Sequence, residues 1–257
     1  KEQVEKMAFS DDAEQVNEWL KQVREFRRLI LEVEDFPLQY FYDVRESIVR
    51  IRIENTHLEE NELFDLRRSL STIDCIVKIL NHSDEDESHA EENDGWRREK
   101  KYTYPSLHLL AKDIVTFPQI VQRIDQILDK FGKIRDNATP ELLQIRRELA
   151  KTEGSISRTL YSILRSAQSE GVVEKDVTPT LRDGRLVIPV IPTLKKKIKG
   201  IVHDESATGK TVFIEPTEVV EANNRVRELE GEERKEIIRI LTQFTNKLRP
   251  YTREIMD

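Results

Sequence analysis

Residues 139–168 read TPELLQIRRELAKTEGSISRTLYSILRSAQ, and their apolar side chains recur in steps of three, four and seven. This spacing places the apolar side chains on one face of a helix. Thr139 is a favoured N-cap residue, and Pro140 suits the first helical position. The pattern therefore predicts a helix roughly 43 Å long at ~1.5 Å per residue. Its apolar face comprises Leu142, Ile145, Leu149, Ile156, Leu160 and Ile163.

A second helix of similar length is predicted from about Thr217, directly after Pro216. Its apolar residues repeat the spacing of the first helix: Val219, Ala222, Val226, Leu229, Ile237, Ile240, Phe244 and Leu248. Two long helices with matching apolar faces are expected to pack as an antiparallel pair, with the residues between them at the far tip. The sequence up to Met256 also suggests that the second helix continues to the end of the chain.

The residues between these helices have the composition of strands. Residues 185–190, 198–202 and 211–214 are rich in β-branched and aliphatic side chains. Asp183-Gly184 and Thr208-Gly209 are turn signals, so we expect an antiparallel sheet of three or four strands. Pro189 and Pro192 lack an amide hydrogen, which predicts that the first of these strands lies on an edge or ends early.

Shorter helices are predicted before residue 139, over residues 11–32, 44–51, 61–80, 107–116 and 118–128. In the first of them, Val16, Leu20, Val23 and Ile30 share one face. Residues 81–95 hold seven acidic side chains and no Lys or Arg, which is typical of a solvated loop. The expected fold is mainly α, with a helical core, two long antiparallel lever helices and a small antiparallel β insert, the clamp, at their tip. The expected domains are a core at 1–139, a first lever helix at 140–178, the clamp at 179–216 and a second lever helix at 217–257.

The composition limits the environment in which this chain works. Cys75 is the only cysteine, which excludes an internal disulfide and favours a reducing, cytoplasmic compartment. No apolar run approaches the ~20 residues of a membrane span, so we expect no membrane partner. The chain opens at Lys1 without an initiator methionine, and we therefore expect it to be a piece of a longer protein.

Two motifs suggest catalytic or nucleotide chemistry. Gly209-Lys210-Thr211 resembles the end of a phosphate-binding loop, but such a loop needs a glycine where Asp204 stands and a helix where residues 211–214 predict a strand. We interpret this motif as a hairpin turn. The second motif, His203-Asp204-Glu205-Ser206, could be an acid–base or metal cluster. Adjacent strand residues point to opposite faces, however, and no second His or Cys stands at ligand spacing. A polar turn at a strand end is the favoured interpretation.

The clamp carries a local positive charge on an acidic chain. Residues 179–216 hold seven Lys or Arg and four Asp or Glu, a net charge of +3, whereas the whole chain has a net charge of −7. We predict nucleic-acid-binding residues at Arg182, Arg185, Lys195, Lys196, Lys197, Lys199 and Lys210. Cations on a protruding element can bind phosphates without contacting bases. The alternative, a solvated run of charge, stays open from the sequence.

The helix–insert–helix region resembles the MutS-II branch of the MutS family. The resemblance is densest at residues 182–190, 200–209 and 213–216, which read RDGRLVIPV, GIVHDESATG and FIEP. It continues through residues 223–229, 134–142 and 145–149, and weaker similarity spans nearly the whole chain. The acidic residues 81–95 have no counterpart in this resemblance.

The resemblance implies a function for a longer parent protein. It implies an ATP- and Mg²⁺-dependent ATPase after the levers and, in many members, a C-terminal Smr endonuclease, neither of which has a motif in this chain. It also implies a homodimeric parent and nucleic acid as partner, either branched or mismatched DNA in recombination suppression or ribosomal RNA in ribosome quality control. For residues 1–257 we expect no catalytic residue, no bound cofactor and no metal. The competing hypothesis is a coiled-coil protein-interaction scaffold or dimerisation module without nucleic-acid contact.

Overall fold

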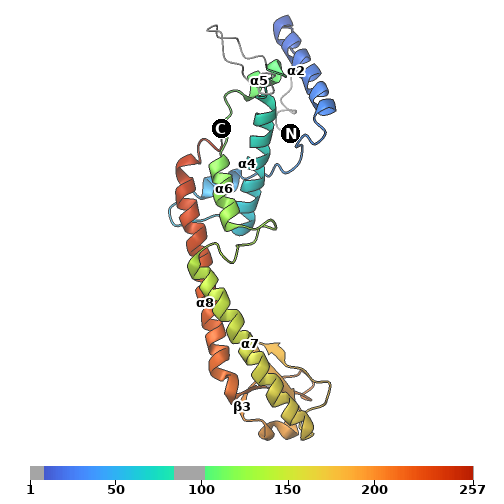
Figure 1. Ribbon diagram of the computed structural model, residues 1–257, viewed down its shortest axis with the longest axis vertical. Helices are drawn as coiled ribbons and strands as arrows, with labels where there is room; N and C mark the ends of the chain where they lie inside the picture. Colours follow the sequence, from blue (N-terminus) through green and yellow to red (C-terminus); the bar gives the residue numbers. More distant parts are fainter. Residues whose placement is uncertain (1–8, 84–101, 257) are drawn as a thin grey trace, which may run out of the picture. The chain divides into compact units, whose positions relative to one another are not determined.

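The computed structural model describes residues 9–83 and 102–256 (Figure 1). The acidic stretch predicted as a loop, residues 81–95, lies outside the described residues from 84 onward. The chain divides into two compact units. The first contains Lys1–Lys133 and Thr245–Asp257, and the second contains Ile134–Phe244.

The first unit is helical. Its helices are α2 (Ala13–Glu32), α3 (Arg45–Arg50), α4 (Glu60–Leu80), α5 (Pro105–Ala111) and α6 (Pro118–Ile127). They confirm the five helices predicted from the sequence, with shifted ends. The helix α4 begins with a capping box between Glu59 and Glu62, and it buries Leu63, Leu66, Leu70 and Val77. Prolines occupy the first position of both α5 and α6, where no amide hydrogen is required.

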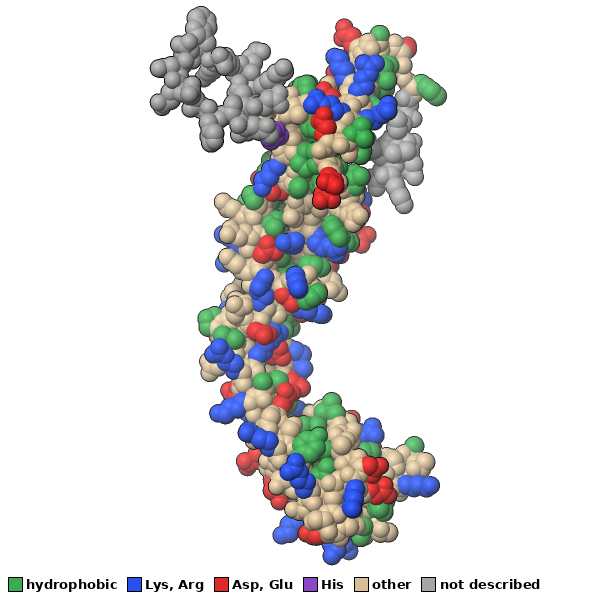
Figure 2. All heavy atoms as spheres, turned by 45° about the vertical axis from the view of Figure 1, so that its right-hand side comes forward, with side chains coloured by type: hydrophobic (Ala, Val, Ile, Leu, Met, Phe, Trp, Pro, Cys, Tyr) green, Lys and Arg blue, Asp and Glu red, His purple; other side chains and the backbone are tan. Residues whose placement is uncertain are grey.

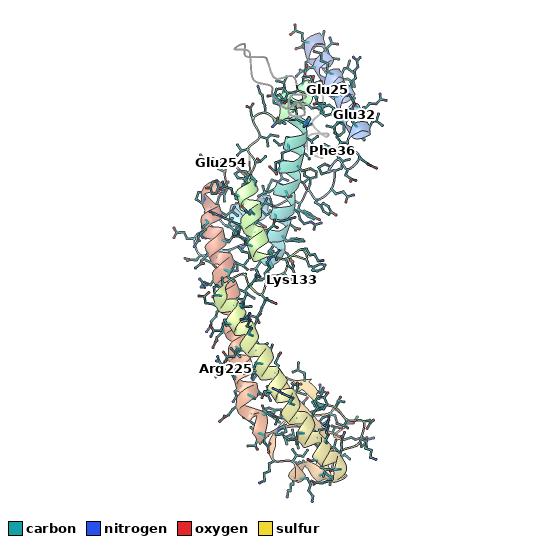
Figure 3. All side chains as sticks on the ribbon, in the orientation of Figure 1. Glu25, Glu32, Phe36, Lys133, Arg225 and Glu254 are labelled. Atoms are coloured by element: carbon teal, nitrogen blue, oxygen red, sulfur yellow. The ribbon has the colours of Figure 1, made fainter. Side chains whose placement is uncertain are left out.

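Helix α2 is joined to α5 by polar contacts that also satisfy the start of α5. The Glu25 carboxylate accepts hydrogen bonds from the backbone N–H groups of Ser106 and Leu107 at 2.8 and 3.0 Å (Figure 3). Glu32 accepts one from the Tyr104 hydroxyl at 2.8 Å. On α2 itself, Leu29 is buried, whereas Leu20, Val23 and Ile30 of the predicted apolar face are exposed.

The second unit is built on the two predicted long helices, α7 (Pro140–Ser169) and α8 (Val220–Leu248). Thr139 caps α7 as predicted, because its hydroxyl accepts the Leu142 N–H at 3.1 Å. The helices run antiparallel: Arg146 of α7 pairs with Glu233 of α8, and Glu148 of α7 pairs with Arg225 nearer the start of α8. Helix α8 ends at Leu248 and is followed by a 3₁₀ turn that contains Pro250, so the expectation of a helix up to Met256 was wrong.

Four antiparallel strands stand between these helices, as predicted. They are β1 (Thr180–Arg182), β2 (Arg185–Val190), β3 (Gly200–Glu205) and β4 (Val212–Pro216), in the order β1-β2-β4-β3. Asp183 and Gly184 join β1 to β2 with φ angles of 48° and 72°, which is the backbone of a tight hairpin turn. The Gly209-Lys210-Thr211 motif lies in the turn between β3 and β4, and a strand follows it. The hairpin interpretation is therefore confirmed.

Pro189 lies in a strand that has neighbours on both sides, which corrects the prediction of an edge strand. The two neighbours pair with different halves of β2. Strand β1 pairs with Arg185–Val187, and β4 pairs with Ile188–Val190. At Pro189 the strand therefore has a single partner, and the proline needs no second hydrogen bond. The strand then ends at Val190, before Pro192 opens a 3₁₀ helix, as predicted.

The sheet packs against the side of α7. Buried residues from the second half of the helix and from the sheet form one apolar cluster, which includes Ile156, Leu160, Leu164, Ala167, Ile188, Val190, Val212 and Ile214. Val219 and Val226, around the start of α8, complete it. The last turns of α7 bury their apolar face on the sheet rather than on α8. In the described part of the chain, no helix is long and apolar enough to cross a membrane.

Candidate nucleic-acid interface

A buried carboxylate, Glu215 on β4, organises the polar side of the insert. Its side chain is 0% exposed in a strand whose residues are all buried. It accepts hydrogen bonds from Arg185 Nη1 and Asn223 Nδ2, each at 2.7 Å, and pairs with His203 Nε2. A charge this deep is tolerated only when its oxygens are paired. The four side chains tie β2, β3, β4 and the start of α8 together.

These partners determine the protonation of Glu215. Burial raises the pKa of the carboxyl, but the hydrogen bonds from Asn223, His203 and Arg185 outweigh it and hold the pKa below the ordinary 4.5. Glu215 is therefore a carboxylate at neutral pH. Glu215 was not predicted as a site residue, although a glutamate directly after the apolar run Val212-Phe213-Ile214 is an available signal of a buried charge.

His203 reaches Glu215 because β3 contains a bulge. Val202 pairs with Ile214 and Asp204 with Phe213, so His203 is the extra residue between two registers. A bulge changes the direction of a side chain. The interpretation of His203 as part of a polar turn was wrong, because His203 lies within β3 and the bulge directs its side chain to Glu215.

Gly200, at the start of β3, is required by close packing. A Cβ atom added there would lie 2.2 Å from the backbone oxygen of Glu215. Only glycine lets β3 approach β4 at this point. The strand and the lysines that precede it are thereby held at a fixed distance from Glu215.

The predicted lysines occupy the exposed entrance to β3. Lys195, Lys196 and Lys197 end the 3₁₀ helix Pro192–Lys197, rather than lying on a strand, and Lys199 directly precedes β3. All four side chains are exposed. Among the described residues none of the four has an acidic partner within ion-pair distance. Figure 2 shows further Lys and Arg side chains over the surface of the insert, with Asp and Glu among them.

The remaining predicted cations differ in their exposure and in their hydrogen-bond and ion-pair partners. Arg185 is engaged by Glu215 and by Asn224, and its side chain is only 14% exposed. Arg182 lies 3.7 Å from Asp204, with its guanidinium 4.2 Å from the centre of the Phe213 ring. Lys210 is exposed at the β3–β4 turn. The structure thus groups Lys195, Lys196, Lys197 and Lys199 and places the other three elsewhere on the insert.

A hollow of about 350 Å³ lies between these lysines and α7. Lys197 and Lys199 line one side, and Ser162 and Ser166 of α7 line the other. Glu170 and Glu218 border the same hollow. No group of three or more His, Cys, Asp or Glu side chains within residues 9–83 and 102–256 could hold a metal ion.

The chain is similar to bacterial proteins named endonuclease MutS2. The one from Levilactobacillus brevis is 35% identical over 250 residues, which make up 97% of this chain and 30% of that protein. The one from a Geobacillus species is 32% identical over 257 residues, 100% of this chain and 31% of that protein. The one from Lacticaseibacillus paracasei is 33% identical over 219 residues, 85% of this chain and 26% of that protein. No protein-family model matches the chain.

This chain belongs to the MutS2 family. It spans about 30% of the length of the MutS2 relatives described above and is a partial MutS2 segment. The residues that bind Glu215 lie in the blocks that carry the MutS-II resemblance. Arg185 is in the block 182–190, His203 in 200–209 and Asn223 in 223–229.

Proposed function

We propose that this MutS2 segment binds nucleic acid through the lysines that lead into β3. In this account the segment is non-catalytic and holds phosphates while chemistry takes place elsewhere in the whole protein. ATP hydrolysis with Mg²⁺, endonuclease activity and homodimerisation belong to that whole protein. The partner is branched or mismatched DNA, or ribosomal RNA, both of which present phosphates.

The observation that carries this proposal is the group Lys195, Lys196, Lys197 and Lys199. Other cations of the second unit, such as Arg146, Arg225 and Arg239, are paired with carboxylates. The four lysines are exposed and have no such partner in the part of the chain that is described. Unpaired lysines bind a phosphate as point charges, without the planar geometry that base recognition requires. Binding is therefore expected to be independent of sequence.

The Glu215 network has a supporting role in this proposal. It fixes β3 against β4 and α8, so the lysines before β3 stand on a rigid base rather than on a loop. Binding groups on rigid elements lose less conformational entropy when the ligand arrives. Arg185 belongs to this base, because its donors are directed to Glu215 and Asn224.

The test changes Lys195, Lys196, Lys197 and Lys199 together to Gln and follows binding to a fluorescein-labelled DNA duplex by anisotropy. Each lost phosphate contact should lower the magnitude of the slope of log affinity against log salt by about 0.9. Circular dichroism provides the folding control, since exposed charges contribute little to stability. Equal affinities and equal slopes for the two proteins would refute the role of the lysines. The chain alone should show no ATP turnover in the same preparations.

A protein-interaction scaffold is the second candidate, and one observation favours it. Strand β3 is an edge strand of the sheet, and its Ile201 and Val202 are 49% and 48% exposed. An exposed apolar edge can pair with a strand of another protein. If the scaffold hypothesis holds, Val202→Lys will abolish partner capture or self-association, and the lysine variant will not.

A further inference from the structure

One face of α7 carries only basic and small polar side chains, apart from one tyrosine. We call it the basic face of α7. It consists of Gln144, Arg147, Lys151, Gly154, Ser155, Arg158, Tyr161, Ser162, Arg165 and Ser169, all of which are exposed. At 3.6 residues per turn, the four cations fall within an arc of about 40°. The buried residues Leu142, Ile156 and Leu160 lie on the opposite side of the helix.

The charge pattern of this face differs from that of an ordinary solvated helix. On α8, the exposed acids Glu221, Glu228 and Glu232 alternate with basic residues. A mixture of signs is typical of a face that only meets water. The basic face of α7 holds four cations and no acid, on a chain whose net charge is −7.

The four cations are also without carboxylate partners, although Arg158 Nε donates a hydrogen bond to the backbone oxygen of Gly154 at 3.2 Å on the same helix. No ion pair joins Arg147, Lys151, Arg158 or Arg165 to a carboxylate among residues 9–83 and 102–256. Neighbouring Arg146 instead pairs with Asp136 and Glu233. Arg146 therefore ties α7 to α8, whereas no carboxylate neutralises the four cations of the basic face, and they can bind an external anion.

Two hollows border the row of cations. One of about 530 Å³ is lined by Arg147, Lys151 and Ser155, together with Glu148, which pairs with Arg225 at 2.9 Å, an arginine that also pairs with Glu228 and Glu232. At the other end, Ser162 lines the hollow that also contains Lys197 and Lys199. The charges in that second hollow are balanced by Glu170 and Glu218, so the inference rests on the cations of α7.

Gly154 leaves open space in the middle of the basic face. A glycine inside a helix costs about 1 kcal/mol relative to alanine. Nothing lies within 4 Å of the Cβ that another residue would place at Gly154, so internal packing does not require it. A glycine flanked by Lys151 and Arg158 on an exposed face lets the backbone of a ligand come close to the helix.

We infer that the basic face of α7 binds the phosphate backbone of duplex nucleic acid. From Arg147 to Arg165 the row is roughly 27 Å long at ~1.5 Å per residue. That length spans about eight base pairs along the axis of a duplex at ~3.4 Å each. A straight row of cations fits a stiff duplex better than a flexible single strand. The inference rests on the proposed function and extends it to a second surface, separate from the insert lysines.

The test compares three variants of the chain with equal changes in net charge. The face variant changes Arg147, Lys151, Arg158 and Arg165 to Gln, and the insert variant is the one described above. The control variant changes Arg24, Arg27, Arg234 and Lys235 to Gln. These four residues are exposed and have no ion partner in the described part of the chain. Binding to labelled duplex DNA, duplex RNA and single-stranded DNA is measured against salt, with circular dichroism as the folding control.

At moderate salt, the affinity of the face variant for duplex should be lower by a factor of roughly ten or more. Its slope of log affinity against log salt should be lower in magnitude by about 3 to 4. The control variant should keep the wild-type slope. A loss of affinity of the face variant for duplex DNA or for duplex RNA supports the inference. Equal salt slopes for the face and control variants overturn it. If only the insert variant weakens, the inference fails and the proposed function stands. If only the face variant weakens, the insert role fails, and wild-type protein without duplex affinity contradicts both.

A crosslinking experiment locates the contact without removing any cation. Cys75 is exposed, so it is first replaced in Cys75→Ser. A photoactivatable aryl azide is then attached to Ser155→Cys on the basic face or to Glu221→Cys on α8. Crosslinks to the labelled duplex should form from position 155 well above those from position 221. Equal yields would overturn the inference.

Discussion

At the scale of single residues, Glu215 shows how a buried charge stabilises a small sheet. Removing one member of a buried ionic group leaves the others unpaired and costs about 3–5 kcal/mol. Glu215→Leu would leave Arg185 and His203 without their carboxylate. Glu215→Gln keeps the shape and loses the charge, so it is the milder probe.

The lowered pKa of Glu215 predicts acid lability of the second unit. Its folded pKa lies below the ordinary 4.5, so its contribution to stability is complete above about pH 4.5 and is lost as the pH falls through the folded pKa. Arg185 and His203 are the charged or titratable groups that face it. The difference in unfolding free energy between wild type and Glu215→Gln should therefore shrink as the pH falls below 4.5, as measured by urea unfolding.

The exposed Glu218, which has no ion partner among the described residues, provides the control for this titration. Glu218→Gln should leave the stability profile unchanged. A difference between wild type and Glu215→Gln that stays constant down to pH 3 would contradict the account of Glu215, since a glutamate in the unfolded chain, with a pKa of about 4.3, is already mostly protonated at pH 3.

Two glycines should respond in opposite ways to alanine. Gly200→Ala places a Cβ 2.2 Å from the Glu215 backbone oxygen, so β3 must shift, at an expected cost on the order of 2–4 kcal/mol. Gly154→Ala adds a methyl group in open space on a helix and should stabilise by about 0.5–1 kcal/mol. Denaturant unfolding of both variants measures these shifts. A Gly200→Ala protein as stable as wild type would show that β3 and β4 are not in close contact there.

The sequence could identify the types of residue at the site but not their contacts. Lys195, Lys196 and Lys197 were predictable because a run of like charge is visible in one dimension. The pairing of His203 with Glu215 was not, because it depends on a bulge between Val202 and Asp204 that no local spacing reveals. The basic face of α7 is visible in the sequence as cations seven residues apart, at positions 151, 158 and 165. It was not predicted, because the apolar period of the same helix is the stronger pattern.

At the scale of elements, α7 joins two different partners along its length. Its first half is tied to α8 by ion pairs, and its second half packs on the sheet. The predicted start of α7 at Thr139-Pro140 and the turn at Asp183-Gly184 agree with the structure, because caps, prolines and glycines act locally, whereas the predicted end of α8 was wrong. The partner of each half was not predictable, since helix length and an apolar face do not specify whether a helix or a sheet covers that face.

Leu160 tests which surface covers the second half of α7. Its side chain is 0% exposed within the cluster that contains Ile188 and Ile214 of the sheet. Leu160→Ala should cost about 2–5 kcal/mol in unfolding free energy, because a cavity remains. Tyr161→Ala, one residue along and 47% exposed, is the matched control and should cost much less. Equal destabilisation by the two changes would mean that the helix is rotated relative to the sheet.

At the scale of the whole molecule, charge is separated by sign. The chain has a net charge of −7, yet the insert carries +3 and one face of α7 holds four cations without an acid. An acidic protein with local basic surfaces repels nucleic acid in general and accepts it where the cations gather. Because phosphates carry no sequence information, this arrangement favours recognition of shape over recognition of bases.

The salt dependence of duplex binding by the wild-type chain measures how many phosphates the segment contacts. If the insert lysines and the basic face both bind phosphates, the slope of log affinity against log salt should be about −4 to −7. The slope should be the same for duplexes of unrelated sequence. A slope near zero, or an affinity that changes strongly with sequence at constant length, would contradict phosphate binding by this MutS2 segment.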